Sequence, residues 1–451
     1  WLKPFLYGAP CRECKPRSAS TAAMDTGNCS LLDANLSLGN LSKSCILPGA
    51  LLEKGGQIEI SYVRWLASYV YDLSCAELKL PGTPVALYLG SWAGLLEVSA
   101  VMVCGLVLLA AVGALCQLAR EAAGLPRWAK AGILGAVGLG MPLLPFAVLE
   151  IRGPMRTMMS NFCMSLLASV GFFRWAELAF RTGPTGVDHS MRSAALYFSS
   201  TAEVLFDDDG RALAPPPGRR WQLFWSALGH AVALLLVIGI AEISQFTPFL
   251  GPGVDILRLP LLGFPWSLPA IWLQAAWTYL SLSATIESGR FIWAIFGVET
   301  HTAMRHPLLL ATSVRDFWGR RWNLLIHRLM HRNFFTPLKA RCGPRAGAVA
   351  AFLASALFHE YSWLLVSWEV THFKPGGPLA FFAVQFVLLT VEAMLKRTSL
   401  GCAVSRLPAP VQTLLTTLAI LPFGPLFLSD LSRAGLLLDT ARLFPHPRLV
   451  A

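Results

Sequence analysis

Long apolar segments limit the fold of this chain more than any other feature of its sequence. Residues 94–119 read GLLEVSAVMVCGLVLLAAVGALCQLA, which exceeds the roughly 20 residues with which a helix crosses the hydrocarbon of a bilayer. Residues 266–298 have room for one tilted helix or for two short ones. Further apolar segments lie at about 128–149, 161–180, 221–241, 349–368, 378–395 and 411–429.

These segments predict an all-α, polytopic membrane protein with about seven or eight transmembrane helices. Only helices and closed barrels satisfy every backbone polar group in lipid, and we find none of the short alternating strands of a barrel. The composition agrees, because 14% of the residues are charged, against about a quarter in a typical soluble domain. The chain has no internal repeat and no dinucleotide or phosphate-loop fingerprint, and we expect no nucleic-acid partner.

Basic residues predict the orientation, since the cytoplasmic loops of membrane proteins collect Lys and Arg. The segment 301–345 has nine basic residues and one acid, Asp316, so it accounts for +8 of the formal net charge of +11. We therefore place this segment in the cytosol. Counting spans outward puts 181–220 and 396–406, which both contain several basic residues, on the same side and the N-terminal tail in the lumen.

The N-terminal tail, residues 1–84, has the features of a lumenal segment. Three glycosylation sequons lie in it, and five of the ten cysteines fall within its first 75 residues. Residues 58–73 have the mixture of aromatic and charged side chains that is typical of an interfacial helix. The sequons are NCS at 28–30 and NLS at 35–37 and 40–42.

Two further features of this tail carry no functional prediction. Cys11 and Cys14 have CxxC spacing but no second pair at zinc-site distance, so we expect no zinc site. No cleavable signal peptide is apparent, and the first methionine is Met24. We leave residues 1–23 out of the functional argument.

The segment 349–368, VAAFLASALFHEYSWLLVSW, contains a histidine and a glutamate in the middle of an apolar helix. If the helix begins near Val349 on the cytosolic side, His359 lies about 15 Å deep. An ionisable residue at that depth usually faces a protein interior or a water-filled cavity. Burial favours the neutral imidazole, which can accept a proton as a general base does. The alternative is a core histidine bonded to a neighbouring helix. Glu360 lies about 100° further around the helix and is expected to pair elsewhere.

The stretch 311–338, ATSVRDFWGRRWNLLIHRLMHRNFFTPL, is both aromatic and basic. From Trp322 to Phe335 its spacing predicts an amphipathic helix. Its basic face contains His327, Arg328, His331 and Arg332. Two interpretations stay open, because such a helix suits the cytosolic membrane surface and its arginines also suit the phosphates of a coenzyme A thioester.

Two metal-binding patterns are incomplete. HEYSW has Trp363 where an HExxH motif has its second histidine. His327 and His331 have i,i+4 spacing, which places both on one helix face, but no acidic third ligand is nearby. We interpret the histidine pair as part of a basic, solvated helix face and expect no metal site.

Two motifs in this order resemble the wax synthase branch of the membrane-bound O-acyltransferase superfamily. They are SVRDFWGRRWN at 313–323 and, 36 residues after Asn323, the histidine of ALFHEY. The resemblance covers roughly 290–400, including RHPL at 305–308, and elsewhere only the pattern of apolar segments is similar. It implies a multi-helix intramembrane enzyme that transfers an acyl group from acyl-CoA to a hydroxyl group.

The resemblance also implies roles for single residues. His359 matches the catalytic histidine of the family, and Asn323 matches its second active-site residue. His359 is expected to accept the proton of the acceptor hydroxyl, while Asn323 holds the carbonyl oxygen or positions the acceptor. Acyl-CoA is the co-substrate, and no metal or redox cofactor is required. A structural or acyl-CoA-binding role is expected for Asp316, Trp318, Arg320 and Arg321.

We expect wax ester synthesis from acyl-CoA and a long-chain fatty alcohol, in the membrane of the endoplasmic reticulum. Sterols, diacylglycerol and secondary metabolites are alternative acceptors, and the number of subunits does not follow from the sequence. The competing classes are an inactive lipid-binding relative and a transporter in which His359, Glu360, Glu287 and Glu392 form a path. We divide the chain into the lumenal tail 1–84, transmembrane helices in 85–298, a wax synthase-like catalytic region 299–430 and a C-terminal tail 431–451.

Overall fold

The computed structural model describes residues 77–79, 85–152, 157–243, 268–368, 375–434 and 436–449. The sequons, the Cys11 and Cys14 pair and the predicted interfacial helix 58–73 lie outside these residues.

The described chain is helical almost throughout, and seven of its helices are long and apolar enough to cross a membrane. This confirms the predicted all-α, multi-pass fold. Six of the seven are α2 (Trp92–Glu121), α3 (Arg127–Arg152), α4 (Met158–Phe180), α6 (Arg219–Ile243), α14 (Pro344–Val366) and α15 (Gly377–Leu395). The seventh candidate span, Ala409–Leu428, begins with α17 (Ala409–Ile420).

The last predicted span, 411–429, is interrupted. After α17 the chain tightens into the 3₁₀ turn η7 (Leu421–Phe423) and continues as α18 (Gly424–Ala434) and α19 (Leu436–Leu443). Pro422 and Pro425 lie at this break and have no backbone N–H for an α-helical ladder, which explains why the regular helix stops here.

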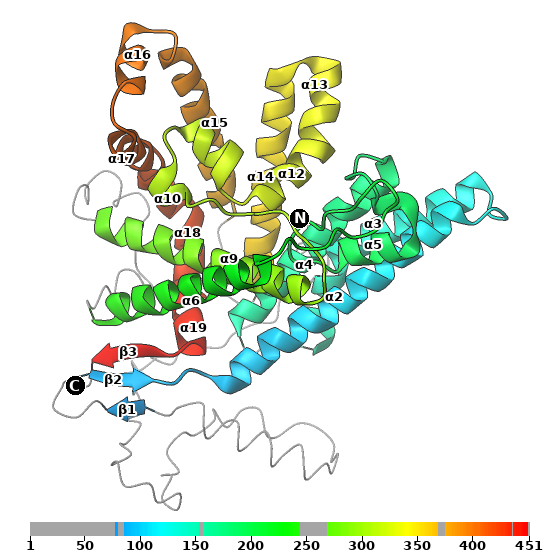
Figure 1. The fold of residues 1–451 in the computed structure, drawn as a ribbon, viewed down its shortest axis with the longest axis horizontal. Helices are drawn as coiled ribbons and strands as arrows, with labels where there is room; N and C mark the ends of the chain where they lie inside the picture. Colours follow the sequence, from blue (N-terminus) through cyan, green and yellow to red (C-terminus); the bar gives the residue numbers. More distant parts are fainter. Residues whose placement is uncertain are drawn as a thin grey trace, which may run out of the picture. The chain divides into compact units, whose positions relative to one another are not determined.

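The stretch 266–298 forms one helix in its described part, α9 (Leu268–Ile295), which is not among the seven candidate spans. It packs along α6, and the two helices run side by side in Figure 1. Arg220, in the first turn of α6, donates from Nε to the carbonyl oxygen of Ala294 at the end of α9, so the two helices are antiparallel. Trp277 of α9 is 1% exposed and belongs to the largest apolar core.

Short helices connect the long ones. Between α4 and α6 lie η4 (Val187–His189) and α5 (Met191–Phe198). Between α9 and α14 lie α10 (Pro307–Leu310), α11 (Val314–Asp316), η5 (Phe317–Arg321), α12 (Leu324–Met330), η6 (His331–Phe335) and α13 (Thr336–Cys342). The helix α16 (Ser399–Ser405) follows α15.

One small antiparallel sheet joins the two ends of the described chain. Its strands are β1 (Glu77–Lys79), β2 (Val85–Tyr88) and β3 (His446–Leu449), in the order β1-β2-β3. Val85 pairs with Leu449 and Tyr88 with His446. The segment before α2 is therefore fixed to the segment after α19 (Figure 1).

Candidate active site

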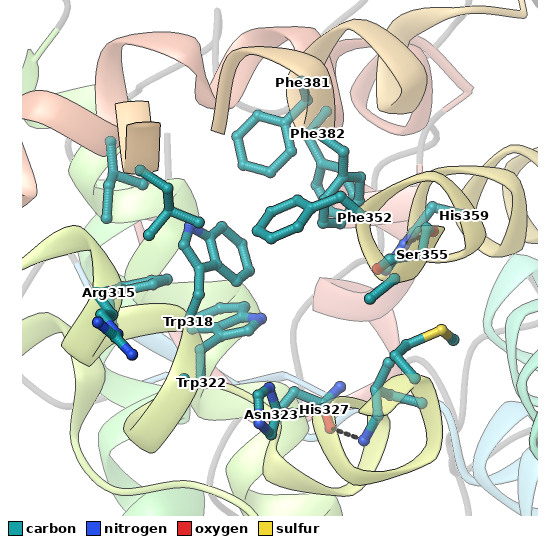
Figure 2. Close-up of a pocket in the computed structure, with 18 of the residues that line it drawn as sticks. Arg315, Trp318, Trp322, Asn323, His327, Phe352, Ser355, His359, Phe381 and Phe382 are labelled. Carbon is teal, nitrogen blue, oxygen red and sulfur yellow. Dashed lines mark hydrogen bonds between the residues drawn. The ribbon is translucent and has the colours of Figure 1, made fainter. Parts of the chain in front are cut away.

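A cavity of about 760 Å³ lies among the helices from α9 to α18. Its walls are mostly aromatic and aliphatic, as in many pockets for apolar ligands. His359 of α14 and Asn323, which precedes α12, both line it, and Figure 2 shows them on different sides of the open space. The structure thus brings the two residues of the sequence motifs to one cavity, although they are 36 positions apart.

The residues that follow His359 fix the rotation of α14 by binding three different helices. Glu360 accepts hydrogen bonds from the N–H groups of Gly376 and Leu379 at the start of α15, at 2.9 and 3.0 Å. Tyr361 donates to the carbonyl oxygen of Pro142 in α3, and Trp363 donates to that of Phe427 in α18. Glu360 therefore pairs elsewhere, as predicted, and His359 faces the cavity. Since α14 begins at Pro344 rather than Val349, His359 lies about 22 Å along the helix from its start, rather than the predicted 15 Å.

The hydrogen bond of His359 determines which ring nitrogen is free. Nδ1 lies 2.7 Å from the carbonyl oxygen of Ser355, one turn earlier in the same helix. A carbonyl oxygen can only accept, so Nδ1 has the proton and Nε2 of the neutral ring is the acceptor. Figure 2 shows Ser355 beside His359 at the cavity wall. The imidazole has no carboxylate partner in the described part of the chain.

Asn323 is held by its backbone and by one end of its side chain. Its φ of 38° lies in the left-handed region, which asparagine tolerates better than most residues. Oδ1 accepts from the N–H of Ile326 at 3.3 Å and so caps α12, as the dashed line in Figure 2 shows. The N–H of the next residue, Leu324, donates to the carbonyl oxygen of Ala303 at 2.7 Å. Because the oxygen is committed to the cap, the Nδ2 amino group is the end available to a ligand.

The four other motif residues divide into two pairs. Trp318 and Arg320 line the cavity. Asp316 and Arg321 do not, because they bind each other, with Arg321 Nε 2.6 Å from Asp316 Oδ2. Arg321 also donates from Nη1 to the carbonyl oxygen of Arg305. Asp316 and Arg321 therefore hold the motif in shape, whereas Trp318 and Arg320 can meet a ligand.

The predicted amphipathic helix from Trp322 to Phe335 is wrong in its start and in its basic face. The helix begins only after Asn323, whose left-handed backbone cannot continue a right-handed helix, and it widens into the π-helical turn η6. Arg328 and Arg332 are partly buried, and they form ion pairs with buried carboxylates from other parts of the chain. Arg328 binds Glu203, and Arg332 binds both Glu177 and Glu203.

His327 and His331 both line the cavity. His331 is also exposed, as expected for a solvated face, whereas His327 is partly buried. Burial lowers the pKa of His327, and the neighbouring His331 and Arg328 lower it further. At neutral pH His327 is therefore an uncharged hydrogen-bonding group rather than a cation. Among the described residues, no group of three or more His, Cys, Asp or Glu could hold a metal ion.

The aromatic part of the cavity wall could not be found from the sequence. It is formed by Trp318, Trp322, Phe352, Phe381, Phe382 and Phe427, some of which Figure 2 labels. In the sequence, aromatic residues of an apolar segment fit a lipid-facing position equally well. The buried ion pairs left a clearer signal, since a charged residue such as Glu177 within a predicted span needs a partner.

Comparison with known proteins gives a consistent result. Residues 302–384, which include the motif and His359, match the model of the Membrane bound O-acyl transferase family. The chain is 28% identical over 325 residues to a long-chain-alcohol O-fatty-acyltransferase of Simmondsia chinensis, a match that spans 67% of this chain and 84% of the relative.

Relatives from Arabidopsis thaliana match shorter parts. The chain is 31% identical over 177 residues to the protein named probable long-chain-alcohol O-fatty-acyltransferase 7, which spans 36% of this chain and 50% of the relative. It is 30% identical over 164 residues to acyl-CoA–sterol O-acyltransferase 1, which spans 34% of this chain and 45% of the relative.

Proposed function

Because this chain belongs to the wax synthase-like part of the membrane-bound O-acyl transferase family, we propose that it esterifies a long-chain alcohol with the acyl group of acyl-CoA. The family match and the seven candidate spans support the more general activity, that of a multi-pass membrane O-acyltransferase. One observation supports the finer proposal most strongly. The bond of His359 Nδ1 to the Ser355 carbonyl leaves Nε2 as a proton acceptor in an apolar cavity that Asn323 also lines.

In the proposed reaction, His359 Nε2 accepts the proton of the alcohol while the alcohol oxygen attacks the thioester carbonyl carbon. The Nδ2 group of Asn323 donates a hydrogen bond to the carbonyl oxygen as it becomes negative. The C–S bond then breaks, the imidazolium returns its proton to the departing sulfur, and the products are an ester and free CoA. No metal or redox step enters this sequence.

The arginines near the cavity support a coenzyme A donor. Arg328 and Arg332 are neutralised by Glu203 and Glu177, so they are not free to bind phosphate. Arg315 and Arg320 line the cavity, are exposed, and form no ion pair with the described residues. Guanidinium groups bind phosphate oxygens in pairs, which makes these two the better candidates for the phosphates of CoA.

The transporter alternative has less support. It needs carboxylates along a path through the membrane, but Glu360 caps α15, Glu287 forms a buried ion pair with Arg290, and Glu392 pairs with Lys396. None of the three carboxylates lines the cavity with His359. They have structural partners instead.

The acceptor class has a second candidate, because the relatives include one named for sterols as well as those named for long-chain alcohols. We favour the long-chain alcohol on the longer match to the Simmondsia chinensis protein. Both acceptors, and the long acyl chain, are insoluble in water, which fits a reaction at the membrane of the endoplasmic reticulum.

The test uses microsomes from a host that lacks neutral-lipid acyltransferases, with wild-type protein or His359→Ala. Labelled palmitoyl-CoA is added with hexadecanol, a sterol or diacylglycerol, and the lipid products are separated. We expect a wax ester from the wild type and a rate about 10²–10⁴-fold lower from the variant at equal protein level. A sterol ester alone would move the proposal to the second acceptor. No ester from any pairing would overturn it.

A further inference from the structure

The imidazole of His359 is enclosed by aromatic rings on several sides. Phe382 of α15 lies 4.9 Å from it, centroid to centroid, and is tilted by only 31°, so it covers one face of the imidazole. Phe427 of α18 lies at the same 4.9 Å but at 66°, against an edge. Phe358 and Trp363 of α14 lie at 4.5 and 5.5 Å in edge contact. We call Phe382 and Phe427, which both line the cavity, the aromatic collar.

The two rings of the collar also contact each other. Their centroids are 5.9 Å apart and the rings are nearly perpendicular, the usual edge-to-face arrangement of packed aromatic side chains. No space for a substrate group remains between them. A hydroxyl therefore reaches Nε2 only from the cavity side, along the edge of the collar.

The position of the collar is fixed by the residues that follow His359 itself. Glu360 holds the start of α15, six residues before Phe382 at the Gly376 N–H. Trp363 Nε1 donates to the backbone carbonyl of Phe427 at 2.7 Å. The backbones of α15 and α18 are thus tied to α14 close to the histidine, so the opening beside Nε2 does not widen by a shift of either helix.

We propose that the aromatic collar selects the acceptor by the number of carbon substituents next to its hydroxyl, and that it admits primary, unbranched alcohols and disfavours secondary ones. This inference rests on the proposed function. To transfer its proton, the alcohol oxygen has to come within roughly 3 Å of Nε2, which brings the carbinol carbon against the collar. A primary carbinol carbon has one carbon substituent, whereas a secondary carbon, such as that of a sterol, has two.

The chain contains a matched control for the collar. Phe381 is adjacent to Phe382, equally buried, and also lines the cavity. It contacts Phe382 and Phe427 at 5.3 and 5.0 Å but has no ring contact with His359. Removing its ring enlarges the same cavity without opening the space beside the histidine.

The experiment compares hexadecan-1-ol with hexadecan-2-ol, which differ only in the substitution of the carbinol carbon, and adds a sterol as a third acceptor. The kcat/KM ratio of the primary to the secondary alcohol is measured for the wild type, Phe382→Ala and Phe381→Ala. We expect a ratio of about tenfold or more for the wild type, since one methylene in a rigid pocket is worth roughly 10–200-fold. Phe382→Ala should lower the ratio at least fivefold, and Phe381→Ala by less than twofold.

Each other result overturns the inference. An unchanged ratio in Phe382→Ala means that the collar does not select the acceptor. An equal change in Phe381→Ala means that the total volume of the cavity, rather than the collar, selects it. If Phe382→Ala does not fold at the wild-type level, the ratio is measured for Phe382→Leu, which keeps an apolar side chain, and the same fivefold criterion applies. If the wild type makes no ester from any alcohol, the proposed function fails and the inference falls with it. Ester formation with an unselective wild type refutes the inference alone.

Discussion

At the scale of single residues, the side-chain amide of Asn323 has two ends, and only one is engaged within the protein. Oδ1 caps α12 through the N–H of Ile326, while Nδ2 remains for a ligand. The structural and chemical roles of this residue can therefore be separated, because aspartate keeps an oxygen for the cap but has no amino group to donate.

We predict that Asn323→Asp folds with a stability within about 0.5 kcal/mol of the wild type, since Asn and Asp are equivalent helix caps. Its kcat should fall about 10²–10³-fold, which is the usual cost of removing one donor to a developing oxyanion. Thermal unfolding in detergent and ester formation measure the two effects. Asn323→Ala, the control, should lose about 1 kcal/mol of cap energy as well. An Asp variant with normal kcat would limit Asn323 to capping.

The sequence predicted two residues that line the cavity, but it did not predict their surroundings. His359 and Asn323 were identified by motif resemblance, and the 100° rotation between neighbouring helix positions correctly predicted that Glu360 pairs elsewhere. Phe382 and Phe427 lie in two apolar segments whose aromatic residues could equally face lipid. Only the packing of α14, α15 and α18 decides which of these rings contacts the histidine.

At the scale of elements, a buried ionic network holds α12 and η6 against α4 and the segment after α5. The side chain of Glu203 is 3% exposed and binds Arg328 and Arg332. Arg332 also binds Glu177, which accepts a hydrogen bond from Tyr197. Since Asn323 begins α12, this network fixes the element that presents Asn323 to the cavity.

The network should make stability depend on pH through Glu203. Burial alone raises the pKa of this carboxyl, but Arg332 and Arg328 lower it, and the net direction is downward. A folded-state pKa below the unfolded value contributes stability above the unfolded pKa, and that contribution is lost as pH falls through the folded pKa. We predict that Glu203→Gln lowers the free energy of unfolding at pH 7 by about 3–5 kcal/mol, because Arg328 loses its carboxylate partner.

The measurement compares apparent melting temperatures of wild type and Glu203→Gln in detergent from pH 7 down to about pH 2.5, because the contribution of Glu203 is lost only as the pH falls through its lowered folded-state pKa. The difference should shrink as the pH falls, because protonation removes the same charge from the wild type. Thr185→Ala, at an exposed position between α4 and η4, serves as a control that leaves the network intact. A difference that is constant over this range would show that the charge of Glu203 is not what stabilises the fold.

Helices whose bounds depend on apolar composition were predicted well. Helices whose bounds depend on the backbone conformation of single residues were predicted less well. The apolar spans are helices near the predicted bounds, because length and hydropathy are sufficient to define them. The break at η7 depends on Pro422 and Pro425 inside an apolar run. The helix predicted from Trp322 to Phe335 is present from Leu324 onward. Its start and its arginines differ from the prediction, because periodicity cannot show that Asn323 adopts a left-handed conformation or that Arg332 has buried carboxylate partners.

At the scale of the whole molecule, the sheet restricts the number of membrane crossings. The strands β2 and β3 are hydrogen-bonded, so the segments before α2 and after α19 lie on the same side of the membrane. The chain between them must then cross the membrane an even number of times. Seven helices of the described chain are long and apolar enough to cross, which is an odd number. We predict that α9 is a further crossing, because it runs antiparallel along α6, which is a candidate span, for 28 residues.

Contacts outside the membrane agree with this count. The N–H of His301 donates to the carbonyl oxygen of Glu203, and that of Glu299 donates to Leu213, so the segments 199–218 and 299–335 lie on one side. The sequence placed both on the cytosolic side by the distribution of basic residues alone. The hydrogen bonds agree that the two segments share a side, while their cytosolic placement stays a prediction. The distribution of basic residues cannot show whether a partly polar helix such as α9 crosses.

The orientation itself is open to a direct test with three cysteines of the described chain. Cys342, before α14, and Cys402, after α15, are exposed, and the two helices between them are two crossings. Both thiols therefore share a side, which the basic residues around them predict to be the cytosol. Cys104 is also exposed, but it lies in the middle of α2, where its surroundings are lipid.

We predict that a membrane-impermeant maleimide added to sealed, cytosolic-side-out microsomes labels Cys342 and Cys402 and leaves Cys104 unlabelled, as read by peptide mass spectrometry. Cys104 is the matched control. It is exposed in the fold, as Cys342 and Cys402 are, but it faces lipid rather than water. Labelling of Cys342 and Cys402 only after permeabilisation would reverse the orientation and place both cysteines in the lumen. Labelling of just one of them would break the parity, because α14 and α15 could not then both cross.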